Sequence, residues 1–151
     1  MHFQFNYSMR SFLIFAAVTG ISFPIVACST KNQAFLEPVV VETLISATQS
    51  WNGDSYEYPS GQAQMSLQRI IAQPGFRTDL HSHPQPGIAY VARGTLFCRT
   101  SDGQSLNIGA GDSFATPQGS IHYCENNGKE ETLVFVASAG AKGKETTIPS
   151  K

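Results

Sequence analysis

Residues 75–94 read GFRTDLHSHPQPGIAYVARG and hold two of the chain's four histidines, His81 and His83. His2 lies in a leader that we expect to be removed, so the mature chain keeps these two and His122. On a β-strand, residues i and i+2 point to the same face, so both imidazoles could bind one ion. The alternative is a pair of surface histidines on a polar loop, and the surrounding sequence must decide.

Glycines and histidines in this stretch follow a fixed spacing. The motif is Gly75, five residues, His81-x-His83, three residues, Gly87, six residues and Gly94. It resembles the first signature of the cupin family, with one departure. The family normally has glutamate where this chain has Gly87.

A second motif begins after a spacer of sixteen residues, close to the spacer of small bacterial cupins. It consists of Gly111, five residues, Pro117-x-Gly119, two residues, His122, three residues and Asn126. Every position matches the second cupin signature. The resemblance covers residues 75–126 and implies an all-β, single-domain jelly-roll barrel.

The resemblance also implies one divalent metal ion inside the barrel, bound by His81, His83 and His122. Three imidazoles leave open positions on the ion for water, substrate or oxygen. Without the glutamate, the site of a divalent ion is formally +2 instead of +1, which favours an anionic, thiolate or hydroxide ligand. The sequence does not distinguish Fe, Zn, Mn, Ni and Cu. The alternative is a degenerate site whose histidines only form hydrogen bonds in a polar core.

Two polar residues near the histidines are candidates for the role of the missing acid. Gln85 is the candidate for a fourth ligand or a substrate contact, although prolines on both sides interrupt the strand geometry around it. Asp79 lies two residues before His81 and shares its face if the strand begins that early. For each of them, a loop residue bonded to backbone or water is the alternative.

Short β-branched or alternating segments, separated by glycine and proline, predict a barrel over residues 39–139. The expected strands are residues 39–45, 65–71, 88–92, 95–100, 105–108, 112–115, 120–125 and 132–137. The sequence SDGQ at residues 101–104 predicts a hairpin turn, because glycine accepts a positive φ. Residues 140–151 are small and polar, and we expect a flexible tail unless it docks on a partner.

The beginning of the chain predicts export. Arg10 is the only charge before Lys31, and the apolar run SFLIFAAVTGISFPIVA at residues 11–27 leads directly into Cys28. This pattern is typical of a signal peptide, here residues 1–27, with Met9 an alternative start to Met1. The run is short for a membrane-spanning helix and contains Gly and Pro.

Residues 25–28, IVAC, resemble the bacterial lipobox, in which the cysteine becomes the lipid-modified first residue of the mature protein. Cys28 is therefore the expected lipid attachment site, and residues 28–38 are the expected tether. The expected location is the periplasm or the cell surface, with contact to the membrane only through the N-terminal lipid. Ordinary secretion and an uncleaved anchor are the alternatives.

The mature part, residues 28–151, has 124 residues, enough for one domain. Loss of Arg10 with the leader, which contains no acid, changes the net charge from −1 to −2. This charge does not fit a nucleic-acid-binding protein. Because cupins often pair through edge strands, which removes an exposed sheet edge, a homodimer is the default expectation.

Cys98 and Cys124 are the two thiols left after lipidation. A disulfide fits an oxidising compartment, and two buried unreactive thiols fit equally well. A metal-bound or redox-active Cys124 is the third reading, since it follows His122 by two residues. Three arginines in or beside expected strands could face inward to pair with a carboxylate or outward in surface salt bridges: Arg69, Arg93 and Arg99.

Two functional hypotheses of different classes fit these observations. The first is a metal-dependent enzyme, most naturally a dioxygenase-like cupin acting on a small anionic or thiol substrate. The second is a non-catalytic, lipid-anchored cupin that binds a small molecule or a metal. Fold alone does not choose between them.

Overall fold

The computed structural model describes residues 39–150. The expected signal peptide, the lipid attachment at Cys28 and the tether up to residue 38 lie outside the described residues. No helix in the described part is long and apolar enough to cross a membrane.

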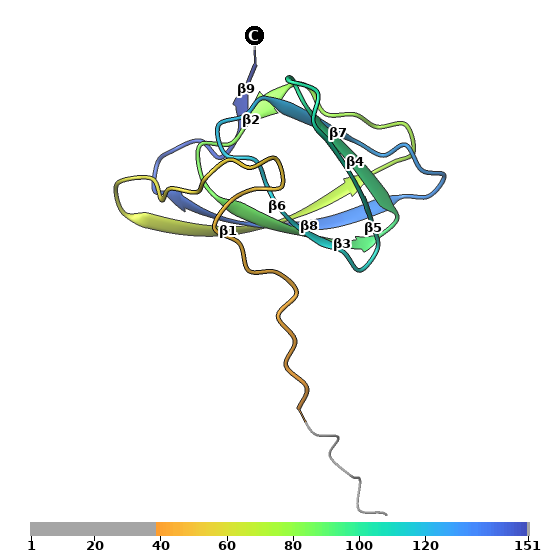
Figure 1. Cartoon of the computed structure of the whole chain (residues 1–151), viewed down its shortest axis with the longest axis horizontal. Helices are drawn as coiled ribbons and strands as arrows, with labels where there is room; N and C mark the ends of the chain where they lie inside the picture. The colour runs from red at the N-terminus through yellow and green to blue at the C-terminus, as the bar shows by residue number, and fades with distance from the viewer. Residues whose placement is uncertain (1–38, 151) are drawn as a thin grey trace, which may run out of the picture. The chain divides into compact units, whose positions relative to one another are not determined.

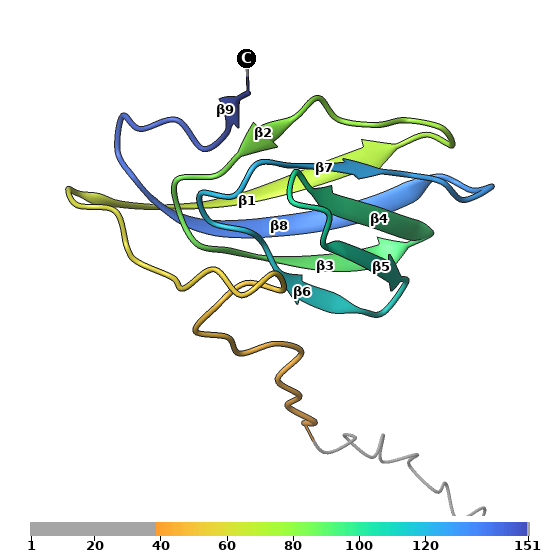
Figure 2. The same cartoon turned by 45° about the horizontal axis from the view of Figure 1, so that its top comes forward.

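Within residues 39–150, nine strands, all paired antiparallel, form two sheets that face each other (Figure 1). They are β1 (Ala63–Ala72), β2 (His81–Ser82), β3 (Gly87–Arg93), β4 (Thr95–Thr100), β5 (Ser105–Gly109), β6 (Ser113–Ala115), β7 (His122–Glu125), β8 (Thr132–Ala141) and β9 (Ile148–Pro149). One sheet has the order β1-β8-β3-β6 and the other the order β5-β4-β7-β2-β9 (Figure 2). This is the all-β jelly roll that the sequence predicts.

Alternating side chains of the strands fill the space between the sheets. In β3, Ala89 and Val91 are buried, whereas Ile88 between Gly87 and Ala89 is 41% exposed. The core cluster takes residues from both sheets: Ala89, Val91, Leu96, Cys98, Ile108, Phe114 and Val134. Burial of this apolar surface is the main force that holds the two layers together.

Gly94, the last residue of the first motif, makes the turn from β3 to β4. Its φ is +76°, a region that residues with a Cβ rarely adopt. A Cβ there would also lie 2.8 Å from the carbonyl oxygen of Glu131 and 2.7 Å from Thr132 Oγ1. The glycine is therefore required by both the backbone conformation and the close approach of β8. The predicted hairpin at residues 101–104 is confirmed, with Gly103 at φ +97° between β4 and β5.

The predicted strand at residues 39–45 is wrong. None of these residues is in a strand, and Val39, Val40 and Val41 are 85–90% exposed. β-branched residues favour a strand only where a neighbouring edge offers backbone partners and a surface for packing. The first strand of the described chain is β1.

The structure also differs from the expected flexible tail at residues 140–151. Strand β8 continues to Ala141, and β9 pairs with β2 through His81↔Pro149 and Ser82↔Ile148. The Ser150 N–H donates to the carbonyl oxygen of Leu80 at 2.8 Å. Composition alone misses this docking because backbone hydrogen bonds, which any residue except proline can donate, hold the segment.

Candidate metal centre

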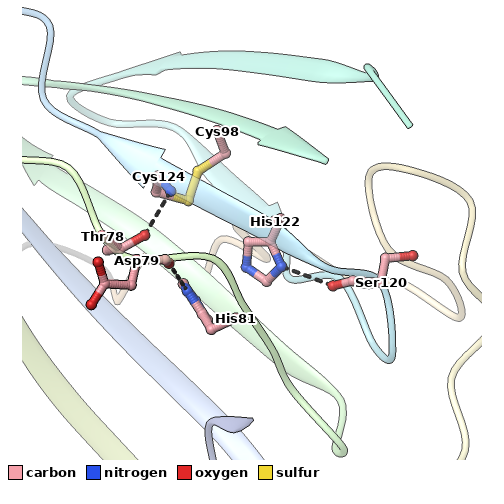
Figure 3. Close-up of a disulfide and its surroundings, with 7 residues drawn as sticks. All are labelled: Thr78, Asp79, His81, Cys98, Ser120, His122 and Cys124. Atoms are coloured by element: carbon pink, nitrogen blue, oxygen red, sulfur yellow. Dashed lines mark hydrogen bonds between the residues drawn. A yellow bond between two sulfur atoms is a disulfide. The ribbon is translucent and has the colours of Figure 1, made fainter. Parts of the chain in front are cut away.

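The two motifs meet where strands β2 and β7 pair. His81 in β2 lies opposite His122 in β7, and His83 follows directly after β2. The Gly119 N–H donates to the carbonyl oxygen of His83 at 2.9 Å, which ties the turn before β7 to the first motif. His81 and His122, 41 positions apart in the sequence, thus bring their side chains to one place (Figure 3).

The three predicted histidines form one cluster. Their candidate ligand nitrogens all lie within 4.8 Å of one another. The ring centroids are 4.5 Å apart for His81 and His122, 5.0 Å for His81 and His83, and 5.1 Å for His83 and His122. Nitrogens at this separation can reach a single ion between them, since metal–imidazole bonds are about 2.0–2.1 Å long.

Each imidazole has one ring nitrogen bonded to a backbone carbonyl. His81 Nδ1 donates to Asp79 O at 2.8 Å and His122 Nδ1 donates to Ser120 O at 3.0 Å (Figure 3). His83 Nδ1 donates to Thr146 O at 2.9 Å. A carbonyl oxygen only accepts, so these bonds keep the proton on Nδ1 and leave the lone pair of Nε2 free for a ligand bond.

Burial favours the neutral form of these ligands. His122 is 2% exposed, and its desolvation lowers its pKa to about 4. Desolvation also lowers the pKa of His83. A metal ion binds neutral imidazole, so no proton has to leave these two rings at neutral pH.

The position of the family's glutamate is closed by neighbouring atoms. A Cβ added at Gly87 would lie 2.7 Å from Thr116 Oγ1 and 3.1 Å from the carbonyl oxygen of Ala137. The cluster of ligand residues in the described chain contains the three histidines and no acid. The Thr116 hydroxyl therefore lies in the space that a side chain at Gly87 would need.

Gln85 does not take the place of the missing acid. It is 4% exposed, and its Nε2 donates to Thr146 O at 2.9 Å, the same carbonyl that His83 Nδ1 uses. Its side chain is not part of the wall of the histidine cavity. In the structure Gln85 therefore contacts the C-terminal segment, and this placement lends no support to its prediction as a fourth ligand or substrate contact.

A cavity of about 430 Å³ lies against the three histidines. Apolar side chains form much of its wall, among them Ile70, Leu96, Phe114, Val134 and Val136. Its acidic wall residues are Asp79 and Glu125, and no lysine or arginine of residues 39–150 lines it. Arg69, Arg93 and Arg99, the three arginines considered for a carboxylate substrate, all lie outside this wall.

The two cysteines form a disulfide, Cys98–Cys124, between directly opposite residues of β4 and β7 (Figure 3). This excludes the reading of two buried free thiols and of a metal-bound thiolate at Cys124. The Cys124 N–H donates to Thr78 Oγ1 at 3.0 Å, so the bridge also joins the loop that leads to His81. Its role is to hold the ligand strand β7.

The sequence did not reveal that the C-terminal segment contributes to the site. Thr146 supplies the carbonyl that orients His83, and Thr147 and Pro149 form part of the cavity wall. The only hint is a short run of β-branched residues at 146–148. Because the contribution of Thr146 comes from its backbone, no residue type at that position would reveal it.

Comparison with known proteins agrees with this architecture. A family model described as Cupin matches residues 33–151. Germin-like protein subfamily 2 member 1 of Arabidopsis thaliana is 36% identical over 78 residues, which cover 48% of this chain and 36% of that protein. Germin-like protein 5-1 of Oryza sativa subsp. japonica is 35% identical over 78 residues, covering 48% and 35%. The matches thus span about a third of the length of these curated relatives.

Among solved structures, the oxalate decarboxylase formate complex of Lactobacillus farciminis is similar at a TM-score of 0.50 and 25% identity. The match covers 58% of this chain and 27% of that chain.

Proposed function

The chain belongs to the cupin family, and we propose that it binds a divalent transition metal through His81, His83 and His122 and presents it to a small molecule. The observation that carries this proposal is the fixed orientation of the three rings. Each Nδ1 is held by a backbone carbonyl, so three Nε2 lone pairs converge beside an open cavity. Neutral imidazole suits Zn, Cu, Fe and Ni.

When bound, such an ion would supply Lewis acidity and, for Fe, Mn or Cu, electron transfer at the open positions. The protein's own residues hold the ligand set and shape the space around it. No arginine or lysine in the described wall can pair with a substrate carboxylate, so an anionic group must be bound by the ion.

The test is metal content. Protein purified without added metal, then saturated with Zn²⁺ and desalted, should hold about one ion per chain, measured by plasma mass spectrometry. His122→Ala and His81→Ala should both lose this ion. Asp79→Asn is the matched control, since Asp79 lines the cavity but lies outside the histidine cluster. Stoichiometric metal in both histidine variants, with their folding verified by circular dichroism, would contradict the proposal.

Within this proposal, a dioxygenase-like enzyme acting on a small anionic or thiol substrate is the first candidate activity. A non-catalytic module that binds a small molecule is the second. The +2 site and its open positions support the first, and the absence of a carboxylate from the histidine cluster of the described residues supports the second. Oxygen consumption by Fe²⁺-loaded protein with a panel of thiols and small acids separates them. Consumption above the His122→Ala background is expected only for an enzyme.

We also propose export and attachment to a membrane through lipid on Cys28. Support comes from the signal-like residues 1–27 and from the Cys98–Cys124 disulfide, which persists in oxidising compartments. Expression of the full chain in a bacterial host should place it in the detergent-soluble membrane fraction. Cys28→Ala should move it out of that fraction, and an unchanged distribution would refute lipid attachment.

A further inference from the structure

We propose that the cavity takes a ligand with a single anionic, metal-coordinating headgroup and an apolar body, and not a compact diacid. This inference rests on the proposed metal site and names the class of molecule that the site accepts. It follows from the positions of the ligands, the charge of the wall and the sheet opposite the histidines.

The two sheets contribute different chemistry to the cavity. His81 and His122 belong to the five-stranded sheet, through β2 and β7. Ile70, Val134, Val136 and Phe114 belong to the four-stranded sheet. A molecule whose headgroup occupies an open position on the ion therefore has the rest of its body against these four apolar side chains.

The register shows that the apolar wall is continuous. Ile70 of β1 lies opposite Val134 of β8, and Ala89 of β3 lies opposite both Val136 and Phe114. Neighbouring strands thus place these side chains on one inner face. Burial of a ligand's methylenes against such a surface stabilises the complex.

The charges of the wall act against a second anionic group. Asp79 and Glu125 line the cavity, and no described lysine or arginine does. A second carboxylate on the ligand would lose its hydration without gaining a cation, and it would be repelled by these acids. One anionic group is accommodated by the ion, and another meets no lysine or arginine among the described residues of the wall.

The exposed part of the cavity wall also carries large apolar side chains, next to the polar Gln68, Asp79 and Thr147. Three of its wall residues remain 42–48% exposed: Ile70, Phe76 and Leu80. Exposed large apolar side chains that gather around an opening are typical of a site for an apolar ligand. The volume of about 430 Å³ lies within the range of roughly 300–1,000 Å³ usual for small-molecule pockets.

The test compares three probes on the Zn²⁺-loaded protein by isothermal titration calorimetry: acetate, hexanoate and adipate. Hexanoate should bind at least about tenfold more tightly than acetate, because its extra methylenes are buried. Adipate, which has the same chain length and a second carboxylate, should bind at least about tenfold more weakly than hexanoate. Equal affinity for hexanoate and acetate, or for adipate and hexanoate, would overturn the inference.

Neighbouring residues of β1 provide a matched pair of variants. Ile70 lines the cavity and is 42% exposed, whereas Ile71 is 50% exposed and outside the cavity wall. Ile70→Ser should weaken hexanoate binding at least about fivefold, while Ile71→Ser should leave it unchanged. A Zn²⁺ titration before each experiment distinguishes failure of the metal site from failure of the ligand inference. Failure to bind Zn²⁺ overturns the metal site and this inference together, and Zn²⁺ binding without the chain-length trend overturns this inference alone.

Discussion

At the scale of single residues, Gly87 defines how this site differs from a cupin with the full motif. A side chain at this position would meet Thr116 Oγ1 at 2.7 Å and the carbonyl oxygen of Ala137 at 3.1 Å. The acid is therefore absent, and the first side-chain atom at this position would already meet its neighbours.

This packing predicts that Gly87→Ala destabilises the protein by about 1–3 kcal/mol, the usual cost of overpacking. Chemical denaturation measures the loss. Thr116→Ala removes the closest atom, so Gly87→Ala should cost less in that background than in the wild type. An equal cost in both backgrounds would show that Thr116 is not the obstacle.

The burial of His122 predicts a pH dependence of the metal-free protein. Its pKa is about 4 in the folded state and 6.5 in the unfolded chain, so the unfolded state binds more protons between these values. The free energy of unfolding should therefore fall as the pH drops from 6.5 toward 4, by up to about 3 kcal/mol from this residue.

Denaturation of chelator-treated protein at pH 7 and pH 5 measures the effect. His122→Gln cannot titrate and should lose part of the wild-type difference between the two pH values. The same difference in both proteins would assign the pH dependence to other groups.

The histidine cluster could be predicted from the sequence, because both motifs resemble the cupin signatures. His81 and His83 are close in the first motif, and the resemblance of the second motif identifies His122 as their companion. The environment of Gln85 does not follow, because it depends on Thr146, which lies 61 residues away. A ligand set can be predicted from a motif, whereas its supporting hydrogen bonds need the folded chain.

At the scale of the elements, the disulfide fixes strand β7 to β4. Cys124 lies two residues after His122, and its partner Cys98 is directly opposite. The bridge closes a loop with a sequence separation of 26 residues. Loss of such a cross-link destabilises a small protein by about 3 kcal/mol in the chain-entropy model.

We therefore expect the double variant Cys98→Ala/Cys124→Ala to unfold at a lower denaturant concentration, because its free energy of unfolding is lower by about 3 kcal/mol. The folded form of this variant should retain Zn²⁺ binding. Denaturation and metal titration measure the two effects. The reduced wild-type protein should be destabilised to a similar degree. If the double variant kept its stability but lost Zn²⁺, the bridge would have a role in the site and not in the fold.

The strand predictions succeeded where turn residues and alternation delimit a strand. Gly103 and Gly94 mark the ends of β4, and the alternation from residue 65 to 71 lies within β1. Residues 39–45 have high β-propensity but no neighbouring strand in the structure, so a strand predicted from composition alone does not form there. Strand β9 has only two residues and carries no pattern of its own.

At the scale of the whole molecule, the C-terminal segment joins the far end of the chain to the metal site. Strand β8 belongs to the four-stranded sheet, and the chain then crosses to add β9 beside β2 in the other sheet. On the way, Thr146 O accepts hydrogen bonds from His83 Nδ1 and Gln85 Nε2, both at 2.9 Å. The orientation of one ligand therefore depends on docking of a segment whose own residues are mostly exposed.

Removal of residues 144–151 should consequently weaken Zn²⁺ binding by about 10–100-fold, the usual effect of losing a hydrogen bond that orients a metal ligand. Glu145→Gln is the control, because it alters an exposed side chain in the same segment and keeps the Thr146 carbonyl.

By thermodynamic linkage, bound Zn²⁺ must stabilise the docked segment to the same extent as docking strengthens the binding of Zn²⁺. Trypsin cleavage after the exposed Lys142 and Lys144 should then slow when Zn²⁺ is added to the wild type, but not when it is added to His122→Ala. Equal Zn²⁺ affinity of the truncated and full-length proteins would show that His83 is oriented without the tail.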